Sequence, residues 1–406
     1  MKKTKLAAVL LSVFIAGGIS FADVNFSGMA GGTAGVNGTI SDSPTFEVPF
    51  NAFIAAQMNF GSWGIFRANL GLATKNLAGG NLFTGQDATL TMNELSFVFT
   101  KSGVKIKNYF SAYLGTYEAV GCDEYLQRQF GIVPYTSLAT KNASTLSTGI
   151  PLYNNYGTGV AYTMNFAEAP GTFGATVYVN ETETKIPKLN IDLRTAWTTE
   201  FLTLDFAAGI GAPLQNSYAG KNVFLLIDTI YLHGGLSLLL GSRYTHSLLL
   251  QGGVQKVEIA KGSLNYSFSG TDDLSLLAEA RIYSKLIKTR ITAYNLPKTI
   301  LKNMLYLQDP LGVVISLYSD TVPVKNNNMT IGAHLIGTLP NEDFTTVISR
   351  SAFKDAVPSI NVYLTPFVDL PVAGGNLEIM AQIGAIDLIN KLHFNYQAKV
   401  GYKKAF

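Results

Sequence analysis

The fold can be predicted from one stretch, KLHFNYQAKVGYKKAF, residues 391–406. Apolar or aromatic side chains occupy every second position: Leu392, Phe394, Tyr396, Ala398, Val400 and Tyr402. The positions between them are polar or glycine: His393, Asn395, Gln397, Lys399, Gly401 and Lys403. Because successive side chains of a β-strand point to opposite faces, this alternation predicts a strand with one apolar and one polar face. The alternation extends over 392–403, which is longer than the usual strand of about five or six residues in soluble proteins.

The first residues carry the pattern of an export signal. Three lysines precede an apolar stretch over 6–16, and a Ser-Phe-Ala sequence ends at Ala22. A basic region, an apolar region and a small-x-small site in this order predict a signal peptide over 1–22, cleaved after Ala22. We therefore expect one mature domain over 23–406.

The charge balance argues against nucleic acid as a partner. The whole chain holds 30 basic and 27 acidic residues, a formal net charge of +3. Removing 1–22 takes away three lysines and no acid, which leaves 27 basic against 27 acidic residues. The mature chain also contains no long run of Lys or Arg, so we expect no nucleic-acid partner.

The composition suggests a membrane protein without membrane helices. Hydrophobic residues make up 47% of the chain and charged residues only 14%, against roughly 25% in soluble domains. The most apolar run of the mature chain, 223–240, is interrupted by Asp228, His233 and a Gly-Gly pair. In lipid, only helices and closed β-barrels satisfy all backbone hydrogen bonds. Because no segment suits a helix, we predict a closed barrel.

The same alternation recurs along the chain. Further segments show it clearly: 46–60, 66–72, 104–114, 189–194, 202–209, 274–282 and 377–383. The strands are about nine to twelve residues long, the length that a tilted strand needs to cross a bilayer. Their second face carries charge, which suits a wet lumen better than the packed core of a soluble sandwich. The apolar phase shifts near Asn93 and Glu94, which predicts a β-bulge there.

Short and long connections alternate between the predicted strands. Membrane barrels have short turns on the periplasmic side and long loops on the outside. We predict an all-β fold, a transmembrane antiparallel β-barrel of about 18 strands, with 16 as the alternative because 222–268 is ambiguous. The first strand, expected over 24–36, closes the barrel against the last strand.

These features resemble the outer-membrane β-barrels of didermic bacteria. In that family the barrel-assembly machinery recognises a terminal strand that ends in an aromatic residue. Phe406, Tyr402, Val400 and Ala398 match the alternate positions of that signal, and Lys404 departs from it. The resemblance implies an outer-membrane location, with outer-membrane lipid and the assembly machinery as partners. The general look, including the Phe-Ala-Asp sequence at the end of the signal, is similar to spirochaete outer-membrane proteins.

The segment over 116–155 is too long for a simple connection. Loops of more than about fifteen residues are usually functional or disordered. It is the third external loop in our strand count, and this arrangement resembles porins, whose third loop folds into the lumen and narrows the pore. A loop that lies over the outer surface is an equally open alternative. If the loop is inside, its charges Asp123, Glu124 and Arg128 should face lumen-side basic residues of the wall. We expect these to be Arg67, Lys105 and Lys107. Opposed charges across a pore set a transverse electric field that selects permeants by charge and size.

The sequence predicts no catalysis, metal site or cofactor. The four histidines are scattered, and none lies at metal-ligand spacing from another. The glycine-rich segment over 28–35 lacks the GxGxxG spacing of a nucleotide loop. Cys122 is the single cysteine, and we expect a shielded thiol.

Three functions fit such a barrel. The one that we favour is a porin-like channel for passive diffusion of small solutes. The second is a surface adhesin or antigen that displays loops such as 116–155 and 339–357. The third is a transporter of hydrophobic substrates similar to the long-chain fatty-acid channels, although a strand that starts at Val24 leaves no residues for their N-terminal plug. Lipid contact near the membrane midplane is expected for Leu70, Ile106 and Leu204, and the oligomeric state is left open.

Overall fold

The structure is a computed structural model of the chain. It describes residues 24–41, 43–77, 88–132, 135–181, 187–214, 229–260, 266–267, 273–324, 327–340, 360–385 and 394–406. The expected signal peptide over 1–22 and most of the expected surface loop over 339–357 lie outside these residues. Among the described residues, no helix is both long and apolar enough to cross a membrane.

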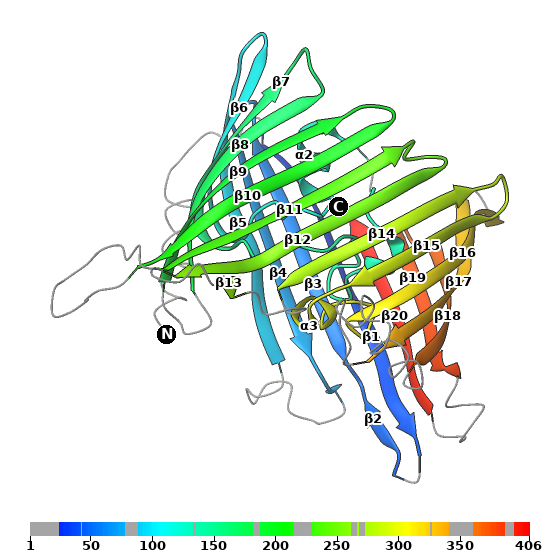
Figure 1. The fold of residues 1–406 in the computed structure, drawn as a ribbon. Coiled ribbons are helices and arrows are strands. Elements are labelled where there is room, and N and C mark those ends of the chain that lie inside the picture. The colour runs from blue at the N-terminus through cyan, green and yellow to red at the C-terminus, as the bar shows by residue number, and fades with distance from the viewer. Residues whose placement is uncertain are drawn as a thin grey trace.

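Eighteen long strands form the wall of one antiparallel barrel in the described part of the chain (Figure 1). The first nine are β1 (Val24–Ile40), β3 (Phe50–Phe60), β4 (Gly64–Thr74), β5 (Ala88–Ser102), β6 (Ile106–Thr116), β7 (Tyr156–Phe166), β8 (Gly171–Glu181), β9 (Pro187–Thr198) and β10 (Leu202–Pro213). The other nine are β11 (Thr229–Gly241), β12 (Ser247–Ala260), β14 (Leu274–Tyr283), β15 (Lys288–Asn295), β16 (Leu311–Val324), β17 (Asn327–Leu339), β18 (Asn361–Val372), β19 (Gly375–Gly384) and β20 (Phe394–Ala405). Two short strands, β2 (Thr45–Glu47) and β13 (Tyr266–Ser267), pair with β1 and β12.

The barrel closes between its first and last strands. Each wall strand pairs antiparallel with the next one along the chain, and β20 returns to pair with β1, where Thr33 lies opposite Gly401. The predicted closure and the predicted 18 strands are therefore confirmed. β1 runs to Ile40, beyond its expected end at Val36, because both β20 and β2 supply partners for the extra residues.

Side chains alternate between the outside of the barrel and its lumen, as the sequence predicts. On β10, Phe206 is exposed on the outer face, whereas its neighbour Asp205 is buried on the lumen face. The β-bulge predicted near Asn93 is confirmed by a register shift between Asn69 and Leu70 on the facing strand. The alternation of outward-facing and lumen-facing side chains thus continues around the wall, and the β-bulge shifts its phase locally.

The turns decide how far along the barrel each residue lies. Leu70 lies in the middle of β4 and faces outward, as expected. Ile106 is the first residue of β6, and Leu204 is close to the start of β10, so both lie beside a short turn. Their expected position near the membrane midplane is therefore wrong. Alternation defines which face of the strand a residue occupies, but it does not define the position of the residue along the barrel axis.

Short turns gather at one end of the barrel, along the upper edge in Figure 1, and long loops at the other. One of these short turns joins β18 to β19 through Ala373 and Gly374, whose φ angles are 53° and 75°. Two successive positive φ values match the twist of the flanking strands, and glycine or asparagine adopts them most readily. We call these two ends the short-turn end and the long-loop end.

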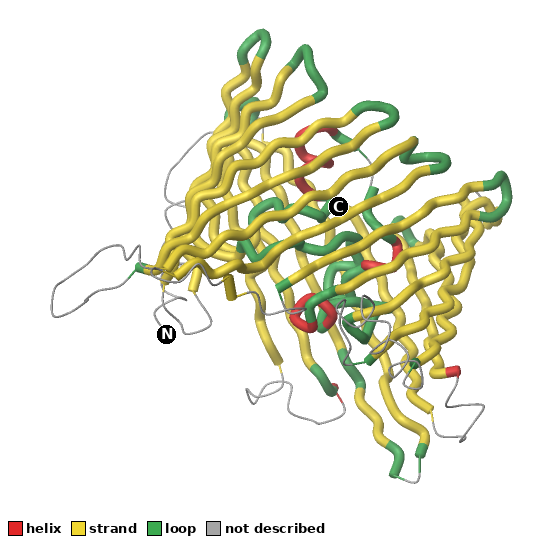
Figure 2. Tube along the Cα trace, viewed as in Figure 1, coloured by secondary structure: helices red, strands yellow, loops and turns green. Residues whose placement is uncertain are grey.

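Two loops from the long-loop end turn back into the barrel, as Figure 2 shows. The first inner loop, residues 117–155, joins β6 to β7 and contains α2 (Glu124–Phe130) and the 3-10 helix η2 (Leu138–Thr140). The second inner loop, residues 296–310, joins β15 to β16 and contains α3 (Lys298–Leu301). Their apolar side chains pack with lumen-facing side chains of the wall into one hydrophobic cluster. The largest apolar core of the described residues therefore lies inside the barrel.

Candidate functional site: the lumen and its two inner loops

The first inner loop crosses the lumen and contacts nearly opposite sides of the wall. Tyr135 Oη donates to Ser237 Oγ on β11 at 3.0 Å. Across the barrel, Thr33 Oγ1 on β1 donates to Ala143 O at 2.9 Å. These contacts place the loop inside the barrel and not over its outer surface.

An ion network holds α2 against β4 and β5. Arg128 lies 2.7 Å from Glu94 and 3.4 Å from Glu118. Glu118 also lies 3.9 Å from Arg67, whose Nε donates to Gln57 Oε1 at 2.9 Å. Burial lowers the pKa of Arg128, but Glu94 and Glu118 raise it more, so the pKa stays above its ordinary value. The Arg128 charge is thus balanced by acids and does not face an open lumen.

Glu279 of β14 anchors the middle of the first inner loop. Its buried carboxylate accepts hydrogen bonds from Arg281 Nε at 2.7 Å and Thr292 Oγ1 at 2.8 Å, and also from Ser137 of the loop. Arg281 in turn donates to Tyr135 O at 2.5 Å. Charged groups on this side of the lumen therefore serve to attach the loop.

Asp123 ties the first inner loop to itself. Its carboxylate accepts hydrogen bonds from Tyr135 N at 3.0 Å, Thr136 Oγ1 at 2.9 Å and Thr148 Oγ1 at 3.0 Å. Burial raises the pKa of Asp123, and these hydrogen bonds oppose the rise. Asp123 was expected to contribute to an electric field across the pore, but here its carboxylate is engaged in hydrogen bonds within the loop.

The neighbours of Asp123 differ in their exposure. Glu124, the first residue of α2, is exposed. Cys122 is half-buried beside Gly149, and burial raises the pKa of its thiol. A raised thiol pKa reduces the thiolate fraction and with it the reactivity of the cysteine.

Lys105 and Lys107 lie away from the first inner loop. Lys105 occupies the short turn between β5 and β6 and faces Glu168 at 3.9 Å, with both side chains largely exposed. Lys107 is exposed near the start of β6. Of the six expected charges, the structure brings Arg67 and Arg128 into one network and leaves these two lysines at the short-turn end.

The tip of the first inner loop, residues 142–147, is a tight turn against β1 and β20. Leu146 has a left-handed φ of 52° and is only 2% exposed, a conformation that persists only where the surroundings hold it. A Cβ atom on Gly401 would lie 2.9 Å from Leu146 Cδ1, so the leucine packs directly on β20. Lys403 Nζ donates to Leu146 O at 2.7 Å. The tip therefore packs inside the lumen against the closing strand pair.

The second inner loop supports the first. Leu305 N donates to Lys141 O at 2.8 Å, and side chains of both loops, Lys141 and Tyr306, bond to Glu378 on β19. This loop was not predicted from the sequence. A sign of the loop in the sequence is the apolar composition of 296–310, which a solvated connection would not have. Its buried residues are Leu296, Ile300, Leu301, Met304, Leu305, Tyr306 and Leu307.

One part of the wall, formed by β20, β1, β3 and β4, has a lumen face of a different kind. These four strands contain no acidic residue. Their lumen-facing side chains are mainly amides and hydroxyls: Thr33, Asn37, Thr39, Asn51, Gln57, Asn59, Asn69, Asn395 and Gln397. Most are half-buried or exposed, whereas Ser237, Glu279 and Ser316 elsewhere in the lumen are at most 1% exposed. We call this part of the barrel the amide wall.

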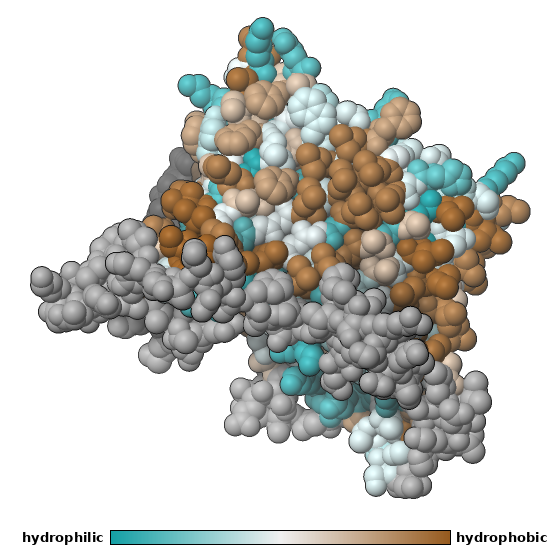
Figure 3. All heavy atoms as spheres, in the orientation of Figure 1, coloured by the Kyte–Doolittle hydropathy of each residue, from teal (hydrophilic) through white to brown (hydrophobic). Residues whose placement is uncertain are grey.

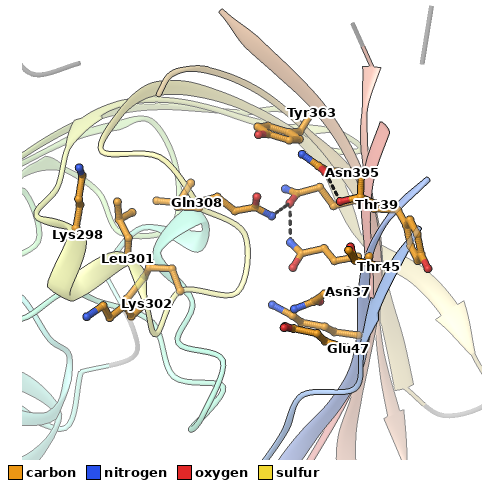
Figure 4. A pocket seen from close by; sticks show the side chains of 17 residues that line it. Asn37, Thr39, Thr45, Glu47, Lys298, Leu301, Lys302, Gln308, Tyr363 and Asn395 are labelled. Carbon is orange, nitrogen blue, oxygen red and sulfur yellow. Dashed lines mark hydrogen bonds between the residues drawn. The ribbon is translucent and has the colours of Figure 1, made fainter. Parts of the chain in front are cut away.

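A cavity of about 710 Å³ separates the amide wall from α3 near the long-loop end (Figure 4). Gln308 reaches across from the second inner loop, and Gln382 Oε1 accepts hydrogen bonds from Gln308 and Gln397, both at 2.6 Å. Among the residues that the structure describes, the charged ones that line the cavity are Lys298, Lys302, Lys399 and Glu47. We call this cavity the vestibule.

The four residues that resemble an assembly signal lie on or just after β20. Val400 is 47% exposed on the outer face, and Ala398 and Tyr402 share that face by alternation. Phe406 stacks on Phe26 at a ring distance of 5.5 Å. Their recognition by assembly machinery stays a prediction.

The comparisons with known proteins bear on the fold alone. No protein-family model matches the sequence, and a search of curated proteins finds no match. Among solved structures, a Rhodopseudomonas blastica porin variant is similar at 11% identity, over 95% of this chain and 100% of that chain, with a TM-score of 0.36. Salmonella typhi OmpF in complex with daunomycin is similar at 9% identity, over 94% of this chain and 97% of that chain, with a TM-score of 0.41. These likenesses give no support to the spirochaete resemblance, and at such low scores nothing about activity is taken from them.

Proposed function

We propose that this protein is a porin-like channel of the outer membrane through which small solutes diffuse passively. The observation that carries the proposal is a closed barrel in which most amide and hydroxyl side chains of the amide wall stay half-buried or exposed, although the tip of the first inner loop contacts β1 and β20. Amides and hydroxyls bind water and exchange hydrogen bonds with polar solutes. A hydrated solute therefore finds partners along this wall without being held tightly.

The outer surface supports insertion in lipid. Exposed apolar side chains face outward on strands around the barrel: Leu70, Val160, Leu193, Ile210, Val313, Leu335, Leu364, Ile379 and Val400. Figure 3 shows such hydrophobic areas on one face, with hydrophilic residues at the tips of the turns above. Exposed aromatic residues near the short-turn end suit a girdle at the membrane interface: Trp63, Phe99, Trp197 and Phe201.

The proposed orientation follows the rule that short turns are periplasmic and long loops external. The short-turn end then faces the periplasm, and the vestibule faces the outside. Export with cleavage after Ala22 and recognition of β20 by the barrel-assembly machinery complete the proposal. Small solutes and outer-membrane lipid are its partners, and no enzymatic step is part of it.

The two other functions fit the contacts less well. An adhesin displays its long loops, whereas the first inner loop is packed inside the barrel by its contacts with Ser237 and Thr33. A transporter of hydrophobic substrates needs an apolar passage, whereas the accessible lumen face carries amides such as Asn51 and Gln57.

The channel is tested by recording from the purified protein in planar bilayers, where we expect discrete conductance steps. In this proposal the tip is the narrowing element of the passage, because it projects into the lumen against β1 and β20. Replacing residues 143–146 by Gly-Gly removes these contacts, so the steps should become larger. The matched control replaces residues 285–286 by Gly-Gly in the turn between β14 and β15, and its steps should be unchanged.

Folding of each variant is checked on gels, because a folded barrel migrates differently before and after boiling. A heat-modifiable barrel that conducts nothing, with or without the tip, contradicts the channel. Equal steps from the tip variant and the unaltered protein contradict the assignment of the tip as the narrowing element.

A further inference from the structure

The amide wall carries an imbalance of charge. Its four strands hold four basic residues, Arg67, Lys399, Lys403 and Lys404, and no acid. By alternation along β20, Lys399 and Lys403 face the lumen and Lys404 faces outward. A solute that moves along this wall therefore meets only positive side-chain charges on these strands.

The lumen-facing bases of the amide wall differ in their partners. Arg67 lies near Glu118 and donates to Gln57, and Lys403 donates to a backbone carbonyl of the tip. Among the residues that the structure describes, no carboxylate lies within ion-pair distance of Lys399. Lys399 is therefore the lumen-facing base of the amide wall whose charge no described side chain neutralises or binds.

The side chain of Lys399 packs against a glycine of the neighbouring strand β1. A Cβ atom on Gly35 would lie 2.7 Å from Lys399 Cγ, so the lysine stem lies across β1 where a side chain would block it. Lys399 also lines the vestibule. Two residues farther along β20, Gly401 contacts Leu146 of the tip. Lys399 thus lines the vestibule two residues before the glycine on which the tip packs.

The rest of the vestibule suits a polar solute of modest size. Its volume of about 710 Å³ is within the range of roughly 300–1,000 Å³ that is usual for small-molecule sites. Amide and hydroxyl groups of Asn37, Thr39 and Gln308 line it. Lys298 and Lys302 lie on the α3 side, so basic residues outnumber acidic ones among the described lining residues, where Glu47 is the single acid.

We infer that the vestibule binds small hydroxylated anions, with a carboxylate or a phosphate group, and that Lys399 determines this preference. The inference rests on the proposed function and names the solute class of the same passage. An excess of basic groups at a narrow entrance concentrates anions and excludes cations. The amides then hold the hydroxyl groups of the solute.

Ion selectivity tests the role of Lys399 in a conducting channel. The reversal potential in a KCl gradient should show a preference for chloride, and Lys399→Gln should shift it towards potassium. Lys399→Arg should keep the preference because it keeps the charge, and Lys404→Gln, on the same strand but the outer face, should leave the potential unchanged. An equal reversal potential for Lys399→Gln and the unaltered protein overturns the inference.

Binding tests the vestibule independently of conduction. Glucose 6-phosphate and glucose are titrated into the folded protein in detergent by calorimetry. Binding of the phosphate ester alone, lost in Lys399→Gln and kept in Lys404→Gln, supports the site even if the barrel fails to conduct. Equal binding of glucose and its phosphate, or binding that Lys399→Gln does not weaken, overturns the site while leaving the channel itself standing.

Discussion

The amide wall and the opposite side of the lumen use polar residues in different ways. On the opposite side, Glu279 and Arg281 are almost completely buried, and they bond to each other and to the first inner loop. On the amide wall, Asn51 and Asn69 stay half-buried, and Lys399 has no acidic partner among the described residues. The difference teaches that charge in a barrel lumen is not by itself a sign of a passage. Paired, buried charge attaches a loop, whereas the side that we propose for solutes carries accessible amides and Lys399, which has no acidic partner among the described residues.

The sharpest way to break this comparison is to remove one polar side chain from each side. Glu279 Oε1 lies 2.7 Å from Arg281 and 3.4 Å from Arg290 of β15, so Glu279→Ala leaves both arginines without their carboxylate. Breaking such a buried pair should cost about 3–5 kcal/mol. Asn69→Ala on the amide wall removes a half-buried amide and should cost about 0.5 kcal/mol or less. Urea unfolding of protein folded into lipid vesicles, followed by tryptophan fluorescence, measures both. Equal losses would mean that the two sides are packed alike.

A second change compares the two faces of one strand. Leu70 and Asn69 are neighbours in the middle of β4, the first 39% exposed on the outer face and the second facing the lumen. Leu70→Lys should cost about 2–4 kcal/mol in a bilayer, and Asn69→Lys should cost less than about 1 kcal/mol because water reaches that face. The same unfolding measurement applies. A Leu70→Lys protein as stable as the Asn69→Lys protein would refute the membrane-facing assignment.

The smallest change provides a reference that touches neither side of the lumen. Ala373 adopts a positive φ that costs an ordinary L-residue roughly 1–2 kcal/mol, and asparagine adopts it more readily. We expect Ala373→Asn to stabilise the barrel by about 0.5–1 kcal/mol. Conductance and ion selectivity should be unaltered. Any loss of stability would show that the turn is not strained at this residue.

The wall of the barrel was predictable because alternation is a local property. The polar and apolar faces of residues 391–406, the phase shift near Asn93 and the alternating lengths of the connections are all visible in the sequence. The closure of β20 on β1 and the bulge opposite Asn69 follow from them.

The interior was predictable only in part. The length of 116–155 singles out a loop, but its partners Ser237, Glu279 and Glu378 stand far away in the sequence. Lys105 shows a second limit of prediction from sequence. The alternating pattern does not indicate where along the barrel axis a charged residue lies. The sequence places Lys399 on the polar face of the last strand. Only the structure shows that Lys399 lines the vestibule and that Gly401, two residues later, contacts the tip.

The tip of the first inner loop has a mechanical consequence. Thr33 on β1 and Lys403 on β20 both donate hydrogen bonds to it, at Ala143 O and Leu146 O. β1 and β20 are also the two strands whose pairing makes the cylinder continuous. Pulling this joint apart sideways therefore breaks a brace inside the cylinder together with the ladder in its wall. Part of such a load passes through the loop to β6 and β7, which lie several strands away around the circumference.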